Sequence, residues 1–148
     1  MFVTSHVLVG AAIGARTPNL VAACGLGVVS HFVLDAVPHW GSDGDHDYFM
    51  RVAVRDGLGG LAALAASAAL SSPRSRWSVL AAAIGAATPD LDKPFAELTG
   101  RRLWPRPIDR FHRKIQRESP RRMRGELSAA AVAAMLTGVL VGRTRARR

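Results

Sequence analysis

Residues 30–40 constrain the fold of this chain most strongly, because they place His31, Asp35 and His39 within an otherwise apolar segment. His31 and Asp35 stand four positions apart, so on a helix their side chains lie on one face and reach a common point. Imidazole nitrogen and carboxylate oxygen are good ligands for zinc and similar divalent ions. Taken alone, the segment predicts either the ligand face of a metal site or an apolar helix with one satisfied histidine and one capping or paired aspartate.

The rest of the chain consists largely of apolar runs rich in Ala and Gly, separated by prolines and polar loops. No run shows the alternation of apolar and polar residues that is typical of strands. A length of 148 residues suits one domain with a real core. We therefore expect an all-α fold, a compact bundle of about five helices in a single metal-binding domain over 1–142, followed by a basic tail over 143–148.

Prolines and polar stretches set the limits of the predicted helices. We expect helices over approximately 4–15, 18–36, 48–70, 76–87 and 125–141. Residues 88–94 contain Pro89 and Pro94, and we expect them not to continue a helix. The basic segment that follows is predicted to be part helix and part loop.

The apolar helices raise the question of a membrane. Only 18–37 reaches the length of about 20 apolar residues that a span needs, and it carries two ionisable groups that are costly in lipid. Basic residues flank both ends of the last helix, so the positive-inside rule gives no clear orientation. We predict a bundle that is associated with the cell membrane (inner or cytoplasmic), or partly embedded in it, rather than a simple four-pass protein.

The formal net charge of +9 is unevenly placed, with basic clusters over 101–124 and 143–148. Such clusters bind nucleic acid or the anionic headgroups of lipids. Because the larger cluster adjoins apolar helices and lacks interleaved stacking aromatics, a lipid surface is the favoured partner. No specific nucleic acid and no protein partner is indicated. The single cysteine, Cys24, excludes an intrachain disulfide and a cysteine-type zinc site.

Further residues of ligand type lie within or at the ends of the apolar helices. The turn 89–92 sets Asp90 and Asp92 one residue apart directly after an apolar helix, where helix capping is the alternative role. Asp56 is expected to pair with Arg51 or Arg55. The predicted ligands of a divalent metal ion, with zinc preferred, are His6, His31, Asp35, His39, Asp90, Asp92 and His112. For His6 the alternative is a polar residue near a helix start, and for His112 a solvated basic face.

These residues resemble the pattern of the bacterial membrane-bound metal-dependent hydrolase-like proteins, a family that includes a LexA-regulated inner-membrane member and is distantly similar to zinc-dependent phospholipase C. The resemblance rests on Ser5-His6 with Gly10, on residues 30–40, on residues 89–92 and on Phe111-His112-Arg113. It implies metal-ligand roles for His6, His31, Asp35, Asp90, Asp92 and His112, and it implies no substrate. Family members often have a histidine after the acidic turn, where this chain has Lys93.

The sequence thus predicts a membrane-associated hydrolase with one or two divalent metal ions that cleaves a phosphoester. A metal lowers the pKa of bound water toward neutrality, and Asp92 or Asp35 is the predicted proton acceptor. The basic region 101–124 is expected to hold an anionic substrate or the lipid surface. Two alternatives stay open: a non-catalytic small helical membrane protein with buried His/Asp pairs, and a basic nucleic-acid-binding module.

Overall fold

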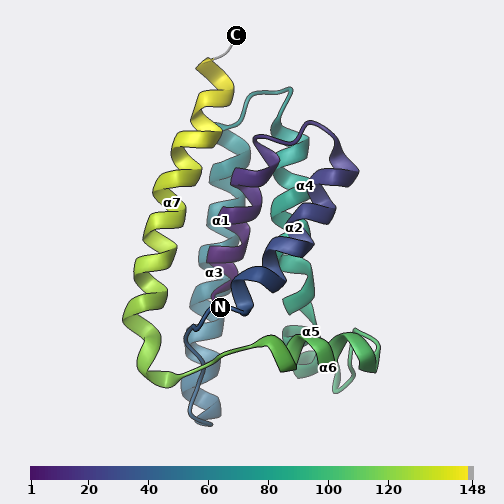
Figure 1. Ribbon diagram of the computed structural model, residues 1–148. Coiled ribbons are helices and arrows are strands. Elements are labelled where there is room, and N and C mark those ends of the chain that lie inside the picture. Colours follow the sequence, from purple (N-terminus) through teal and green to yellow (C-terminus); the bar gives the residue numbers. More distant parts are fainter. Residues whose placement is uncertain (147–148) are drawn as a thin grey trace.

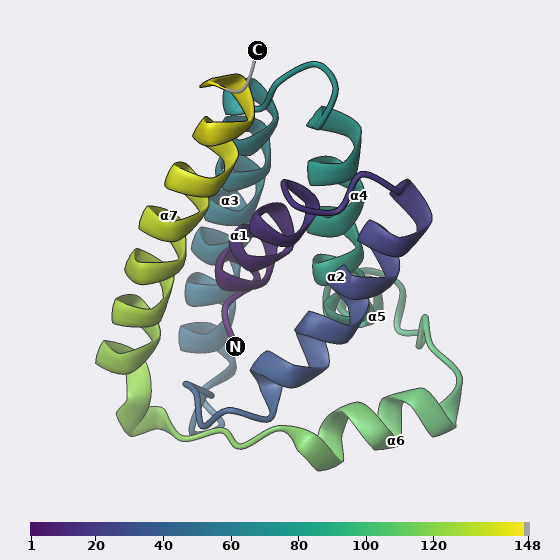
Figure 2. The same cartoon turned by 45° about the horizontal axis from the view of Figure 1, so that its top comes forward.

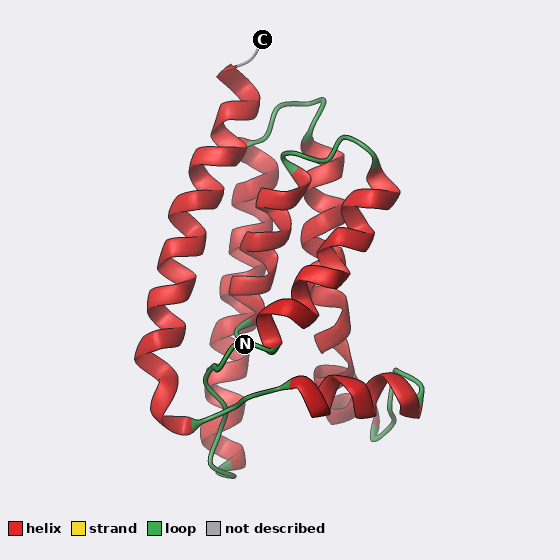
Figure 3. Cartoon of the chain, viewed as in Figure 1, coloured by secondary structure: helices red, strands yellow, loops and turns green. Residues whose placement is uncertain are grey.

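The computed structural model describes residues 1–146, and the regular elements of this range are all helical. Short loops join them (Figure 3). The elements are α1 (Val3–Gly14), α2 (Leu20–Asp35), α3 (His46–Leu70), α4 (Arg76–Ala87), α5 (Asp92–Thr99), α6 (Arg106–Ile115) and α7 (Met123–Ala146), with 3-10 turns η1 (Thr88–Leu91) and η2 (Pro120–Arg122). The predicted all-α fold is confirmed, and the predicted helix over 76–87 has the bounds of α4.

The structure has more helices than the predicted count of about five, and residues 88–94, which we expected not to continue a helix, belong to η1 and to the start of α5. That prediction was wrong for a physical reason. Pro94 is the third residue of α5, where a backbone N–H has no partner within the helix, so proline removes no hydrogen bond. Gly100, with a φ of 66°, then ends α5 in the left-handed conformation that glycine adopts easily.

Helix α1 lies at the centre of the bundle, in contact with α2, α3, α4 and α7. Figures 1 and 2 show α5 and α6 lying across one end of the bundle, next to the ends of α2 and α4. Helix α7 continues through Ala146, so residues 143–146 of the predicted basic tail are helical. The last residues of that tail, 147–148, lie outside the described range.

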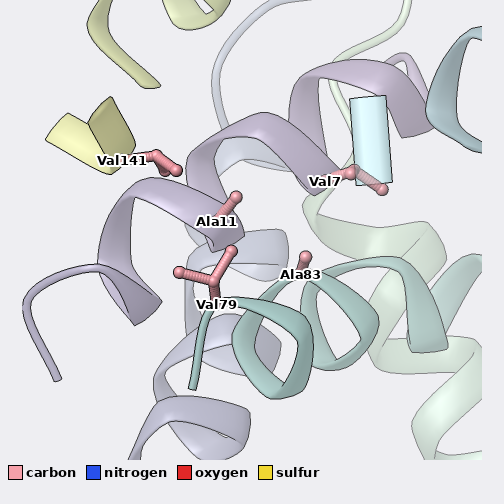
Figure 4. Packing of buried hydrophobic residues seen from close by; sticks show 5 residues of the cluster. All are labelled: Val7, Ala11, Val79, Ala83 and Val141. Carbon is pink, nitrogen blue, oxygen red and sulfur yellow. The ribbon is translucent and has the colours of Figure 1, made fainter. Parts of the chain in front are cut away.

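Glycines bring the central helices into backbone contact. A Cβ atom on Gly27 of α2 would lie 2.1 Å from the Ala82 carbonyl oxygen of α4, and one on Gly14 of α1 would lie 2.3 Å from the Ser78 oxygen. The apolar core consists of small side chains (Figure 4), namely Val7, Ala11, Val79, Ala83 and Val141. Since these side chains bury little surface each, close approach of the helix backbones supplies much of the packing.

Two carboxylates hold the start of α1. Asp56 of α3 accepts the backbone N–H groups of Val3 and Thr4 at 2.6 and 3.0 Å. Glu126 of α7 is buried and accepts the N–H of Phe2 at 2.8 Å. Negative charge at a helix N-terminus is stabilising. Asp56 therefore caps α1 and does not pair with an arginine as we predicted.

Two helical segments are long and apolar enough to cross a membrane, His46–Leu70 and Pro120–Ala146. Length and composition alone establish no membrane. The prediction that only 18–37 is long enough for a span was wrong, because Asn19 caps α2 from outside and this helix ends at Asp35, which leaves 16 residues.

Replacing Gly27 with Ala should lower the free energy of unfolding by about 1–3 kcal/mol, because the new methyl group cannot fit against Ala82. The matched control is Gly25→Ala in the same helix, where a Cβ meets no atom within 4 Å. This control should be neutral or stabilising by about 0.5–1 kcal/mol. Thermal unfolding followed by circular dichroism measures both, and equal midpoints for the two variants would contradict the close approach of α2 and α4.

Candidate metal centre

Four side chains from three parts of the chain meet at the end of the bundle that α5 and α6 cover. His31 and Asp35 lie one turn apart at the end of α2, Asp90 lies in η1, and His112 comes from α6. Each offers one ligand atom, and these atoms all lie within 4.8 Å of one another. Both α2 side chains are fully buried. The structure thus brings together four of the predicted metal ligands.

The Asp35 carboxylate is the hub of this cluster. Its Oδ2 lies 2.7 Å from His112 Nε2 and 3.3 Å from His31 Nε2. Its Oδ1 lies 3.1 Å from His6 Nε2. Burial opposes ionisation of Asp35, but the hydrogen bonds from the three imidazoles outweigh it and lower its pKa. The cluster therefore contains an ionised carboxylate that is buried away from solvent.

The hydrogen-bond pattern of His31 fits a metal ligand. Its Nδ1 lies 2.8 Å from the Ala86 carbonyl oxygen, to which it donates. With Nδ1 as the donor to Ala86, Nε2 is the nitrogen that would bind a metal, and it lies 3.3 Å from Asp35 Oδ2 and 3.0 Å from His112 Nε2. Metal-bound histidines characteristically donate their other N–H in this way, which fixes the ring and its tautomer.

The distances between the ligand atoms are also of the right size. Zinc bonds of about 2.0–2.1 Å in a tetrahedral arrangement separate neighbouring ligand atoms by about 3.3 Å. The separations of 3.0 Å between His31 Nε2 and His112 Nε2 and of 3.3 Å between His31 Nε2 and Asp35 Oδ2 approach this value. The donor set, its geometry and the tautomer of His31 fit a divalent ion such as zinc.

His6 is adjacent to these four side chains but is not one of the four candidate ligands. Its ring stacks on His31 with centroids 4.0 Å apart, and its buried Nδ1 has no hydrogen-bond partner. Burial lowers the pKa of His6 to about 4, so the ring is neutral at neutral pH. A neutral ring with a free Nδ1 donates from Nε2 to Asp35. His6 therefore orients the Asp35 carboxylate.

Asp90 differs from the other members because one oxygen faces a cation. Lys93 Nζ lies 3.0 Å from its buried Oδ1 as an ion pair. Burial opposes ionisation, but the charges of Lys93 and His31 outweigh it and lower the pKa of Asp90. The carboxylate is therefore ionised.

Besides His6, two further predicted ligands lie outside the group, His39 and Asp92. His39 Nδ1 donates to the Val37 carbonyl oxygen at 2.8 Å, and its Nε2 lies 3.8 Å from Glu118 Oε1. Asp92 Oδ1 accepts the backbone N–H groups of Leu103 and Trp104, so this carboxylate holds the loop between α5 and α6. Asp92, predicted as a metal ligand and proton acceptor, therefore binds the backbone of a loop, and it does not cap the start of α5, which was the alternative role for this turn.

Sequence reasoning missed two groups that contact Asp35. Gln116 Nε2 donates to Asp35 Oδ2 at 3.2 Å, and the Met1 amino group lies 2.8 Å from Oδ1. Gln116 follows His112 by four positions, and this helical spacing is a signal that identifies it. No comparable signal in the sequence points to Met1.

Comparison with known proteins identifies no relative. No family model matches the chain, and neither the curated proteins nor the solved structures contain a match. The geometry of the cluster therefore carries the functional interpretation.

Purified chain should bind zinc, and His31→Ala should lose it, because this change removes a central ligand. His46→Ala is the matched control, since His46 is exposed and pairs with Glu97 outside the cluster. Elemental analysis gives the metal content of each variant. Zinc should also dissociate in acid, because protons compete with the metal ion for the ligand atoms. Equal metal content in the wild type and His31→Ala would exclude this ligand set.

Proposed function

We propose that this protein is a metal-dependent hydrolase associated with the cell membrane, and that it cleaves phosphoesters. The observation that carries the proposal is the convergence of His31, Asp35, Asp90 and His112. Structural zinc sites are typically rich in cysteine, whereas nitrogen and oxygen ligands without thiolates are typical of catalytic zinc. A bound divalent ion would supply a Lewis acid and lower the pKa of water at this cluster.

The residues of the chain have distinct parts in this proposal. Asp35 and His31 form the rigid wall of the site, with His6 and Gln116 holding the Asp35 carboxylate in place. Asp90 belongs to the cluster, whereas Asp92 Oδ1 accepts two backbone N–H groups of the 103–104 loop and lies outside it. The Lys93 ammonium beside Asp90 supplies positive charge for an anionic phosphoester.

The surface supports association with a lipid membrane. Many large apolar side chains of α2, α3 and α7 are exposed, including Val33, Leu61 and Met135. Helix α6 lies across the end of the bundle (Figure 2) and exposes both basic and apolar residues, namely Arg106, Ile108, Arg110, Phe111 and Lys114. A short basic amphipathic helix in this orientation is typical of the membrane–water interface.

A non-catalytic membrane protein is the second candidate, because the same imidazoles also pair with Asp35 when no metal is bound. In that case the cluster only neutralises a buried carboxylate. Metal content and hydrolysis distinguish the two candidates, since only the hydrolase requires both.

His112→Asn should reduce the rate of phosphodiester hydrolysis by about 100-fold or more, because the amide cannot replace the imidazole as a metal ligand. Hydrolysis of bis(4-nitrophenyl) phosphate by zinc-loaded chain measures the rate, and His46→Asn is the control with unchanged activity. Removal of zinc with a chelator should abolish activity, and added zinc should restore it. A zinc-loaded wild type that hydrolyses no phosphoester would overturn the hydrolase function.

Met135→Arg should reduce the amount of chain found in the membrane, because Met135 is 65% exposed on an apolar face of α7. In lipid the charge costs about 2.5–3.5 kcal/mol at a helix centre, whereas on a surface facing water it costs little. Met135→Leu is the matched control. Immunoblots of membrane pellets after an alkaline wash measure the retained protein. Membrane association would be contradicted if the wild type is found in the soluble fraction and the Met135→Arg variant is equally abundant there.

A further inference from the structure

A cavity of about 890 Å³ lies beside the candidate metal centre and includes Asp90 in its wall. This volume is within the range of sites that bind small molecules. Residues of α1, α3 and α4 form most of the wall, and its apolar part contains Val7, Leu61, Leu64, Ala83, Ile84 and Ala87. Asp90 and Lys93 also line the cavity, so it joins an apolar interior to the polar cluster.

Lys93 supplies the ammonium group in the wall of this cavity, where it pairs with Asp90 at 3.0 Å. Every other acidic side chain in the wall has a partner of its own: Asp45 accepts the N–H of Tyr48, Asp56 accepts those of Val3 and Thr4, Glu97 lies 3.3 Å from His46 Nε2, and Glu118 lies 3.8 Å from His39 Nε2. The cavity therefore offers an ammonium group and a candidate metal cluster next to an apolar wall. This combination suits a phosphate attached to a hydrocarbon chain.

The wall of the cavity includes residues on the apolar exterior of the bundle. Leu58 and Leu61 of α3 and Ile84 of α4 line it, and their side chains are 63%, 65% and 52% exposed. A hydrocarbon chain can enter the cavity past these three apolar side chains without crossing a polar surface. Entry from a lipid phase is therefore favoured over entry of a polar solute.

We propose that this cavity binds the hydrocarbon chain of a single-chain lipid phosphoester, with its phosphate at the Lys93 ammonium group, next to the candidate metal cluster. The inference rests on the proposed hydrolase function and specifies its substrate class. Each methylene group that the cavity buries should strengthen binding about fourfold. A long-chain phosphate should therefore bind far more tightly than a short-chain one.

Gly57 provides a direct way to fill the cavity. It lines the wall, and a Cβ atom at this position meets no atom within 4 Å. Gly57→Leu therefore adds a side chain inside the cavity without a backbone clash. Gly138→Leu in α7 is the matched control, because its Cβ also meets no atom within 4 Å and this residue is not part of the wall.

The test compares octyl phosphate with ethyl phosphate on the full chain in lipid nanodiscs, with and without cobalt. Calorimetry gives the affinities, and cobalt-induced relaxation of the phosphorus nucleus reports how near the phosphate lies to the metal. We expect octyl phosphate to bind more than tenfold tighter than ethyl phosphate. We also expect Gly57→Leu to lose at least tenfold in octyl phosphate affinity, and Gly138→Leu to lose none.

The outcomes separate this inference from the proposed function. Failure of the chain to bind cobalt would contradict the metal centre, whereas the affinity of metal-free chain for octyl phosphate still tests the cavity. Equal binding of the two phosphates, or equal affinity of Gly57→Leu and wild type for octyl phosphate, would overturn the lipid assignment. Bound octyl phosphate without cobalt-induced relaxation would also overturn it, because the phosphate would then lie away from the cluster.

Discussion

The buried carboxylate of Asp35 is the interaction on which the arrangement of this protein depends. It is fully buried, and an isolated ionised carboxylate in such a place is very unfavourable. The imidazoles of His6 in α1, His31 in α2 and His112 in α6 compensate the Asp35 charge. The same contacts tie α6 to the end of the bundle, although few other contacts join α6 to the helices it crosses. One charge therefore positions both the cluster and the basic helix beside it.

The bundle can deliver these side chains to one point because its helices pack without large side chains between them. Gly27 and Gly14 allow α2 and α1 to approach the backbone of α4. Asp56 and Glu126 then fix the start of α1, which sets the height of His6 along the bundle. Small residues and buried carboxylates have complementary roles here, since close packing leaves no room for water to solvate the charges.

The local part of this structure could be predicted from the sequence and the long-range part only in outline. The spacing of His31 and Asp35 predicted a shared helical face, and the structure has it because an i, i+4 pair depends only on helix geometry. Asp90 and Asp92 are both aspartates and stand two positions apart. Yet the Asp92 carboxylate accepts hydrogen bonds from the backbone of the 103–104 loop. That difference depends on how α5 and α6 pack, which no local pattern contains.

The contrast between Asp90 and Asp92 also explains why this end of the bundle is suited to chemistry. The Oδ1 atom of Asp92 accepts two backbone N–H groups, so this carboxylate holds a loop. Asp90 is free of such donors, lies beside the Lys93 ammonium, and borders both the imidazole cluster and the apolar cavity. The Lys93 ammonium compensates the charge of Asp90 within the fold. Because the same carboxylate also belongs to the cluster and lines the cavity, it is placed where a bound ligand would meet it.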